Sequence, residues 1–270
     1  MRSDDKVVVA PPKAIGRGAT ACVFRPAIAC DGRLLDNSKV SKIYRSKANA
    51  DNDWAIDTKI GAIDPGNMYS VKAYSKCDLL REHVPKEYFS DRCARIGGEA
   101  GPVDNWDLPA YTQIIYEYAG ISYRSYMEIK PFLEEYMRAI LPLFYGLELF
   151  HAHGTTHGDI SLANVAYNLE KDYFILLDFG NGNGSYVATE EDFSSDSARL
   201  PGQFFRDFFL SFERRYDDAE FYKAFPHDAK YKDSLKSLVF SVDFTFQRLY
   251  DYARDQFGIV FDPTTGKFIS

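Results

Sequence analysis

Three oxygen-bearing side chains stand near one another in the segments HGDISLANV (157–165) and FILLDFG (174–180). Asp159 precedes Asn164 by five residues in a run of small and apolar residues, and Asp178 follows an apolar stretch. Hard divalent cations such as Mg²⁺ take oxygen ligands and often bind through one or two protein groups plus substrate phosphates. We therefore expect Asn164 and Asp178 to hold Mg²⁺, which leaves Asp159 to accept a proton from an attacking hydroxyl group.

This chemistry requires a second site that holds the phosphates of a nucleotide. The segment AIGRGATACVF (14–24) is the candidate, because Gly16 and Gly18 allow the backbone to approach a ligand closely between two strands. The match to G-x-G-x-x-G is partial, since Ala21 stands at the third glycine.

The next segment, KVSKIY (39–44), has the pattern of a strand, whose alternation places Val40 and Lys42 on one face. We expect Val23 and Val40 to press on the adenine ring and Lys42 to reach the α and β phosphates.

The elements that position these residues change in character along the chain. Up to about residue 118, short β-rich runs alternate with Gly, Pro, Asn and Asp, in the segments KVVVA (6–10), ACVF (21–24), KVSKIY (39–44) and YTQIIYEY (111–118). From Pro131 to about His151, apolar residues recur at helical spacing, and a second helical block covers 234–257. Between them, VAYNLEKDYFILL (165–177) predicts two short strands. The pattern predicts an α+β protein with a β-rich domain at 1–118 and a helical domain at 119–270.

Composition limits the class of protein. The chain is 46% hydrophobic and 16% aromatic, which is typical of a packed globular protein. No apolar run approaches the length of a membrane span and the N-terminus lacks a secretory pattern, so we expect a soluble, intracellular protein with no membrane partner. A net charge of -7 predicts no nucleic-acid partner. The four cysteines show no C-x-x-C pairing, which favours reduced thiols.

In order and approximate spacing, these motifs resemble the protein-kinase superfamily over nearly the whole chain. Several segments, such as IGRGATACVFRPAIAC, IGAIDP and YEYAGIS, are similar to serine/threonine kinase-like proteins of large double-stranded DNA viruses. The resemblance implies a two-lobed fold, ATP and Mg²⁺ as cofactors, a protein substrate with a Ser or Thr acceptor, and a location in the host cytoplasm or the virion. It does not predict the oligomeric state.

The resemblance also assigns roles to individual residues. Asp159 becomes the catalytic base, Asn164 and Asp178 the metal ligands, and Lys42 the phosphate-binding lysine. The adenine pocket includes Ile15 beside the glycine loop. The segment IIYEYAG (114–120) is similar to the hinge between lobes, with Tyr116 at the gatekeeper position and the backbone of Glu117 and Ala119 at the adenine edge.

The family lysine pairs with a glutamate on a nearby helix, but ANADNDWAIDTKIGAIDP (48–65) contains none. We expect Asp53 to take this role, because Ile56, Ile60 and Ile63 follow at three, seven and ten residues and place it on the buried face. Asp57 is the rival. Either carboxylate is one methylene shorter than glutamate, so the helix must sit closer or the pair is loose.

Other positions that differ from the protein-kinase pattern concern regulation and the support of the catalytic loop. Gly158 replaces the arginine that binds a phosphorylated activation loop, which predicts activity without such phosphorylation. Ser161 stands at the catalytic-loop lysine, and Asp196 resembles the buried aspartate that supports the catalytic loop from the next helix. His157 is expected to brace this loop, since the histidines at 151, 153 and 157 lack further ligands at metal spacing.

Two alternatives stay open. HGD followed by a residue other than lysine also resembles small-molecule kinases of the aminoglycoside and choline kinase type. A pseudokinase that binds nucleotide without transfer is the third hypothesis, because of Ala21, Ser161 and the missing helix glutamate.

Overall fold

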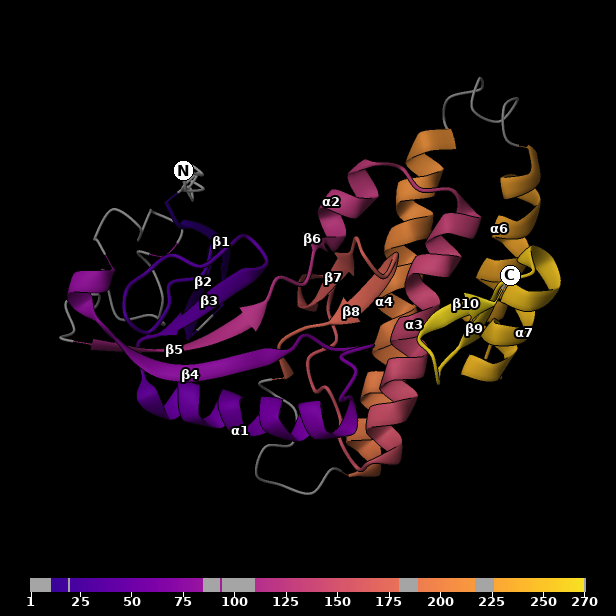
Figure 1. Ribbon diagram of the computed structural model, residues 1–270. Helices are drawn as coiled ribbons and strands as arrows, with labels where there is room; N and C mark the ends of the chain where they lie inside the picture. Colours follow the sequence, from indigo (N-terminus) through magenta and orange to yellow (C-terminus); the bar gives the residue numbers. More distant parts are fainter. Residues whose placement is uncertain are drawn as a thin grey trace, which may run out of the picture. The chain divides into compact units, whose positions relative to one another are not determined.

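The computed structural model of the chain describes residues 11–18, 20–84, 93, 110–179, 189–216 and 226–269. It is an α+β protein, with an antiparallel five-stranded sheet followed by a mostly helical part (Figure 1). The chain divides into unit 1, residues 1–61 and 71–118, and unit 2, residues 62–70 and 119–270. Residues 62–70 thus group with the helical part, whereas the predicted boundary is a single crossing near residue 118. The predicted strand at 6–10 and the predicted Gly180 turn lie outside the described residues.

Unit 1 is built on a sheet with the strand order β1-β2-β3-β5-β4. Its strands are β1 (Lys13–Arg17), β2 (Ala21–Arg25), β3 (Lys39–Tyr44), β4 (Ala73–Leu80) and β5 (Ala110–Glu117). All neighbours are antiparallel, and Val23 lies opposite Lys42 while Val40 lies opposite Tyr116. Because side chains alternate between the faces of a strand, these four residues share one face of the sheet.

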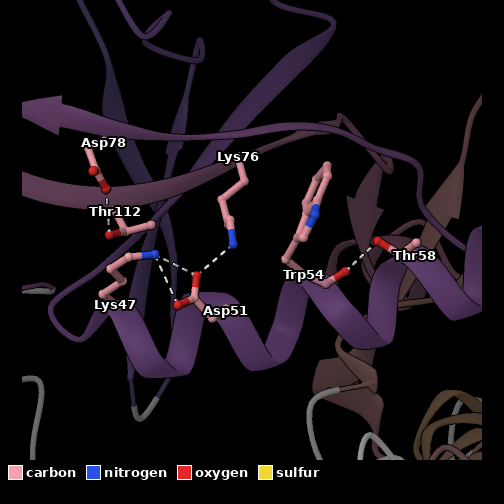
Figure 2. A network of polar contacts seen from close by, with 7 residues as sticks. All are labelled: Lys47, Asp51, Trp54, Thr58, Lys76, Asp78 and Thr112. Atoms are coloured by element: carbon pink, nitrogen blue, oxygen red, sulfur yellow. Dashed lines mark hydrogen bonds and ion pairs between the residues drawn. The ribbon is translucent and has the colours of Figure 1, made fainter.

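Helix α1 (Lys47–Ile63) packs on that face. Ala50 and Trp54 of the helix join the apolar cluster of the sheet. Figure 2 shows the ion pairs of Asp51 beside this contact. Asp51 accepts hydrogen bonds from Lys47 at 2.9 and 3.0 Å and from Lys76 of β4 at 2.6 Å. These partly exposed ion pairs add little stability, but they connect the helix to an edge strand of the sheet.

The opposite face of the sheet is also covered, and all four cysteines lie in this region. They form the disulfides Cys22–Cys93 and Cys30–Cys77, each with 6.0 Å between the Cα atoms. The prediction of reduced thiols is therefore wrong. The paired cysteines are 71 and 47 residues apart in sequence and come together only in the folded sheet. Local spacing in the sequence therefore does not indicate these disulfides.

Unit 2 is organised around the helix predicted from apolar spacing, which is observed as α3 (Leu133–Ala152). It packs against α4 (Glu190–Tyr216), where the rings of Tyr136 and Phe208 stack with centroids 4.0 Å apart. The Tyr136 hydroxyl donates to the backbone oxygen of Phe204 at 2.8 Å, so this buried phenol has a polar partner. The aromatic run from Phe204 belongs to the core of the helical unit.

The remaining elements of unit 2 are short. They are β6 (Ile121–Ser122), α2 (Tyr123–Glu128), η3 (Leu162–Asn164), β7 (Val165–Asn168), β8 (Tyr173–Leu176), α6 (Pro226–Val239), α7 (Phe246–Phe257), β9 (Val260–Asp262) and β10 (Lys267–Ile269). The helical block predicted at 234–257 is divided, because Thr245 caps the start of α7 by accepting from the Arg248 amide at 3.3 Å. None of the helices in the described ranges has both the length and the apolar character that a bilayer crossing requires.

Candidate functional site

The loop between α3 and β7 brings the predicted base and metal ligand into contact. The Asn164 side-chain nitrogen donates to the backbone oxygen and to the carboxylate Oδ2 of Asp159, at 2.9 Å in both cases. The 3-10 turn η3 closes this arrangement, with the Asn164 amide donating to the Ser161 carbonyl at 3.0 Å. Because the amide nitrogen is turned to Asp159, the Asn164 Oδ1 atom receives no hydrogen bond from the residues that the structure describes and remains available as an oxygen ligand.

Asp196 of α4 binds the first residues of this loop. Its carboxylate is buried and accepts from the backbone amides of His157 at 2.6 Å and Gly158 at 3.1 Å. The His151 Nε2 atom lies 3.5 Å from the same carboxylate. The predicted support of the loop by Asp196 is confirmed by these contacts.

His157 is buried and its two ring nitrogens have different partners. Nε2 lies 2.8 Å from the Leu177 carbonyl, which can only accept, and Nδ1 accepts from the Asp159 amide at 3.3 Å. These partners select the neutral ring with the proton on Nε2. Burial lowers the pKa of His157, although the charges of the three carboxylates Asp196, Asp178 and Asp159 oppose that shift. The ring therefore stays neutral and braces the loop, as predicted.

Asp178 follows β8 and is tied to the loop through its neighbour Leu177. The Leu177 amide donates to the Asn164 carbonyl at 2.8 Å, while the Leu177 carbonyl binds His157. Asp178 itself has φ +57°, in the left-handed region that residues other than glycine rarely adopt. Such conformations cost free energy and concentrate at functional sites, so the position of this carboxylate is specified by its surroundings.

In the described ranges, no group of three or more His, Cys, Asp and Glu side chains is arranged to hold a metal ion. The predicted pair Asn164 and Asp178 is a smaller protein ligand set than that. It fits Mg²⁺, which commonly keeps waters and binds through one or two protein groups plus phosphates.

In unit 1, the predicted lysine pair is present. Lys42 Nζ lies 2.9 Å from Asp53 Oδ2, and the two side chains are each 14% exposed. The shorter aspartate therefore does not leave this pair loose. Asp57, the rival, accepts from the Tyr116 hydroxyl at 2.5 Å. Val23 and Val40 flank Lys42 and Tyr116 on the same face of the sheet.

The glycine loop forms the turn between β1 and β2, with the Gly18 amide donating to the Ala21 carbonyl at 3.0 Å. A Cβ atom at Gly16 would meet Val23 at 3.6 Å and one at Gly18 would meet Ala21 at 3.8 Å, both ordinary contact distances. Packing within the described chain therefore does not require glycine at either position. Ile15 in β1 is exposed, at 46%.

The predicted hinge residues fall at the junction of the two units. Glu117 ends β5, and its amide donates to the Lys72 carbonyl at 2.9 Å. Ala119 is the first residue of the following segment of unit 2. The loop that carries Asp159 and Asn164 thus belongs to unit 2, and the Lys42–Asp53 pair belongs to unit 1.

Tyr44 is a further contributor to this pair that the sequence pattern did not predict. Its hydroxyl donates to Asp53 Oδ2 at 2.7 Å, the same oxygen that Lys42 contacts. Strand alternation carries the signal, since residue 44 shares a face with residue 42 in β3.

No protein-family model matches the chain, and no curated protein is significantly similar to it.

Proposed function

We propose that the chain is an ATP-dependent phosphotransferase with a two-lobed protein-kinase-like fold, and that it transfers the γ-phosphoryl group to a Ser or Thr hydroxyl of a protein. One observation carries this proposal: the loop that joins Asp159 to Asn164 is braced by the buried Asp196 and His157 and is tied to the residue before Asp178. Three oxygen-bearing side chains held on one fixed support are what positioning of a phosphoryl group and its metal requires.

Unit 1 supports the same function. The Lys42–Asp53 pair supplies a fixed cation for nucleotide phosphates on the face of the sheet that also carries Val23 and Val40. Packing of the described residues would permit a side chain at Gly16 and at Gly18. Glycine at these positions is therefore better explained by close approach of a ligand to the backbone.

The residues have distinct roles in this mechanism. The Asp159 carboxylate, oriented by Asn164, accepts the proton of the acceptor hydroxyl as that oxygen attacks phosphorus. Asn164 Oδ1 and the Asp178 carboxylate would hold Mg²⁺, which when bound neutralises charge on the phosphates. Lys42 holds the phosphates, and neutral His157 keeps the loop in place.

Transfer of labelled γ-phosphate from Mg-ATP tests the proposal. The purified chain would be offered a protein panel, itself and a panel of small alcohols and amino sugars, with Asp159→Asn beside the control Asp233→Asn, an exposed residue of α6. We expect labelled Ser or Thr in protein, lost in Asp159→Asn and retained in the control. Label in small molecules alone would replace the protein-kinase proposal with the small-molecule kinase, and ATP binding without any transfer would leave the pseudokinase.

A further inference from the structure

Two buried tyrosines of the unit 1 sheet bind the two aspartates that were candidates to pair with Lys42. Tyr44 of β3 donates to Asp53 at 2.7 Å, and Tyr116 of β5 donates to Asp57 at 2.5 Å. Together these contacts form a polar network between the inner face of the sheet and one side of α1.

Asp53 occupies a special place in this network because a single oxygen atom, Oδ2, receives both the Lys42 ammonium and the Tyr44 hydroxyl. The backbone of α1 is held nearby by the packing of Ala50 and Trp54 in the apolar cluster of the sheet, beside the ion pair of Asp51 with Lys76 that Figure 2 shows. With the helix fixed, the remaining freedom of Asp53 is rotation of its short side chain. Two donors that converge on one oxygen remove that freedom.

The two donors respond differently to a nucleotide. Phosphate oxygens compete with Asp53 for the Lys42 ammonium, and their negative charge repels the carboxylate. The Tyr44 hydroxyl is fully buried on the sheet and takes no part in that competition. It gives Asp53 a partner that persists when Lys42 contacts a ligand.

Tyr44 is suited to this role over the whole working pH range. Burial and the neighbouring Asp53 charge raise the pKa of its phenol, so the group remains a protonated donor. Its ring centroid also lies 5.3 Å from Lys42 Nζ, within the range of a cation–π contact. A change from tyrosine to phenylalanine removes the hydroxyl group and keeps this ring.

We propose that Tyr44 is a positioning residue, whose hydroxyl group holds the Asp53 carboxylate beside Lys42 while the ammonium group binds the phosphates of ATP. This inference rests on the proposed function, because it concerns the lysine that would bind the nucleotide. The tyrosine supplies the second fixed point that an aspartate needs in place of the longer glutamate.

Binding of Mg-ATP, measured by isothermal titration calorimetry, tests the inference with a matched pair of variants. Tyr44→Phe and Tyr250→Phe each delete one hydroxyl that donates to a carboxylate at 2.7 Å, to Asp53 in the first variant and to Glu148 of α3 in the second. A hydrogen bond to a charged group corresponds to a roughly 10- to 100-fold change, so we expect Tyr44→Phe to weaken binding about tenfold. Tyr250→Phe alters no residue of the proposed nucleotide site and should change binding less than about threefold.

A double-mutant cycle separates positioning from general destabilisation. In an Asp53→Asn background, Tyr44→Phe should cause no further loss of ATP affinity, because its effect passes through Asp53. Urea unfolding of Tyr44→Phe and Tyr250→Phe should show similar losses of stability, because each variant deletes one hydroxyl that donates to a carboxylate, so that a binding loss confined to Tyr44→Phe has another cause.

The outcomes separate this inference from the proposed function. If the wild-type chain binds Mg-ATP and Tyr44→Phe binds as tightly as Tyr250→Phe, Tyr44 is not a positioning residue and the proposed function stands. Independent, additive losses from Tyr44→Phe and Asp53→Asn would also overturn the inference. If the wild-type chain binds no nucleotide, the proposed function fails and the positioning role fails with it.

Discussion

The buried neutral His157 makes the stability of unit 2 dependent on pH. Its Nδ1 accepts from the Asp159 amide, so a second ring proton would face an N–H donor and break the brace of the loop. Burial lowers the pKa of His157 below its usual 6.5. Between pH 6.5 and that lowered value the unfolded chain binds a proton that the folded protein does not, and stability therefore falls as the pH falls.

The size of the effect follows from this linkage. For each pH unit below about 6.5 over which only the unfolded chain binds this proton, about 1.4 kcal/mol of unfolding free energy is lost through this one group. Urea unfolding followed by helical circular dichroism reports on unit 2, which contains most of the helices. The loss should be larger in the wild-type chain than in His157→Gln, whose amide can still donate to the Leu177 carbonyl.

The exposed residue His153 provides the matched control, since His153→Gln removes one imidazole without touching the buried brace. As the pH falls, His153→Gln should lose more unfolding free energy than His157→Gln, because it keeps the buried His157. Equal pH dependence in wild type and His157→Gln would refute the reasoning, because it would mean that the pKa of His157 is not lowered by folding.

Three further substitutions or treatments test the packing. Asp64→Asn should lower the unfolding free energy in urea by about 2–3 kcal/mol, because the buried Asp64 carboxylate accepts hydrogen bonds from three backbone amides and a hydroxyl. The side-chain NH₂ of asparagine would face these donors. A loss below about 0.5 kcal/mol would contradict the contacts. Gly120→Ala should cost about 2 kcal/mol or more, since φ is +124° and a Cβ atom would lie 1.9 Å from the Tyr167 carbonyl oxygen; unchanged stability would show that this approach is wrong. The unfolded, unreduced chain should show no thiol reactive toward Ellman's reagent, and reduction should lower stability by about 2–4 kcal/mol. Four reactive thiols before reduction would refute the disulfide pairing.

Period and turn signals predicted most of the architecture. The apolar spacing in 131–151 predicted α3, and the β-rich runs in 21–24, 39–44 and 111–118 are the observed strands β2, β3 and β5. The two strands predicted around residues 165 to 177 are β7 and β8. These elements were predictable because each has a local hydrophobic pattern that agrees with its tertiary environment.

Features that depend on long-range geometry were not predictable in the same way. The cysteines have no local spacing that indicates pairing, because the sheet alone brings Cys22 to Cys93. The choice between Asp53 and Asp57 depended on the rotation of α1, and the isoleucines that follow Asp53 indicated it correctly as the neighbour of Lys42. The part of Tyr44 was missed because a buried tyrosine in a strand is most simply interpreted as core.

The central claim is that Asp159 acts on the acceptor hydroxyl and Asp178 on the metal. Titration of ATP with and without Mg²⁺, beside initial rates of phosphoryl transfer, tests it in Asp159→Asn and Asp178→Asn. We predict that Asp159→Asn binds Mg-ATP within about threefold of the wild-type chain and transfers at least about 10²-fold more slowly, as expected for loss of a general base. Asp178→Asn should lose the dependence of ATP binding on Mg²⁺. Wild-type transfer rates in Asp159→Asn, or unchanged dependence on Mg²⁺ in Asp178→Asn, would contradict the account.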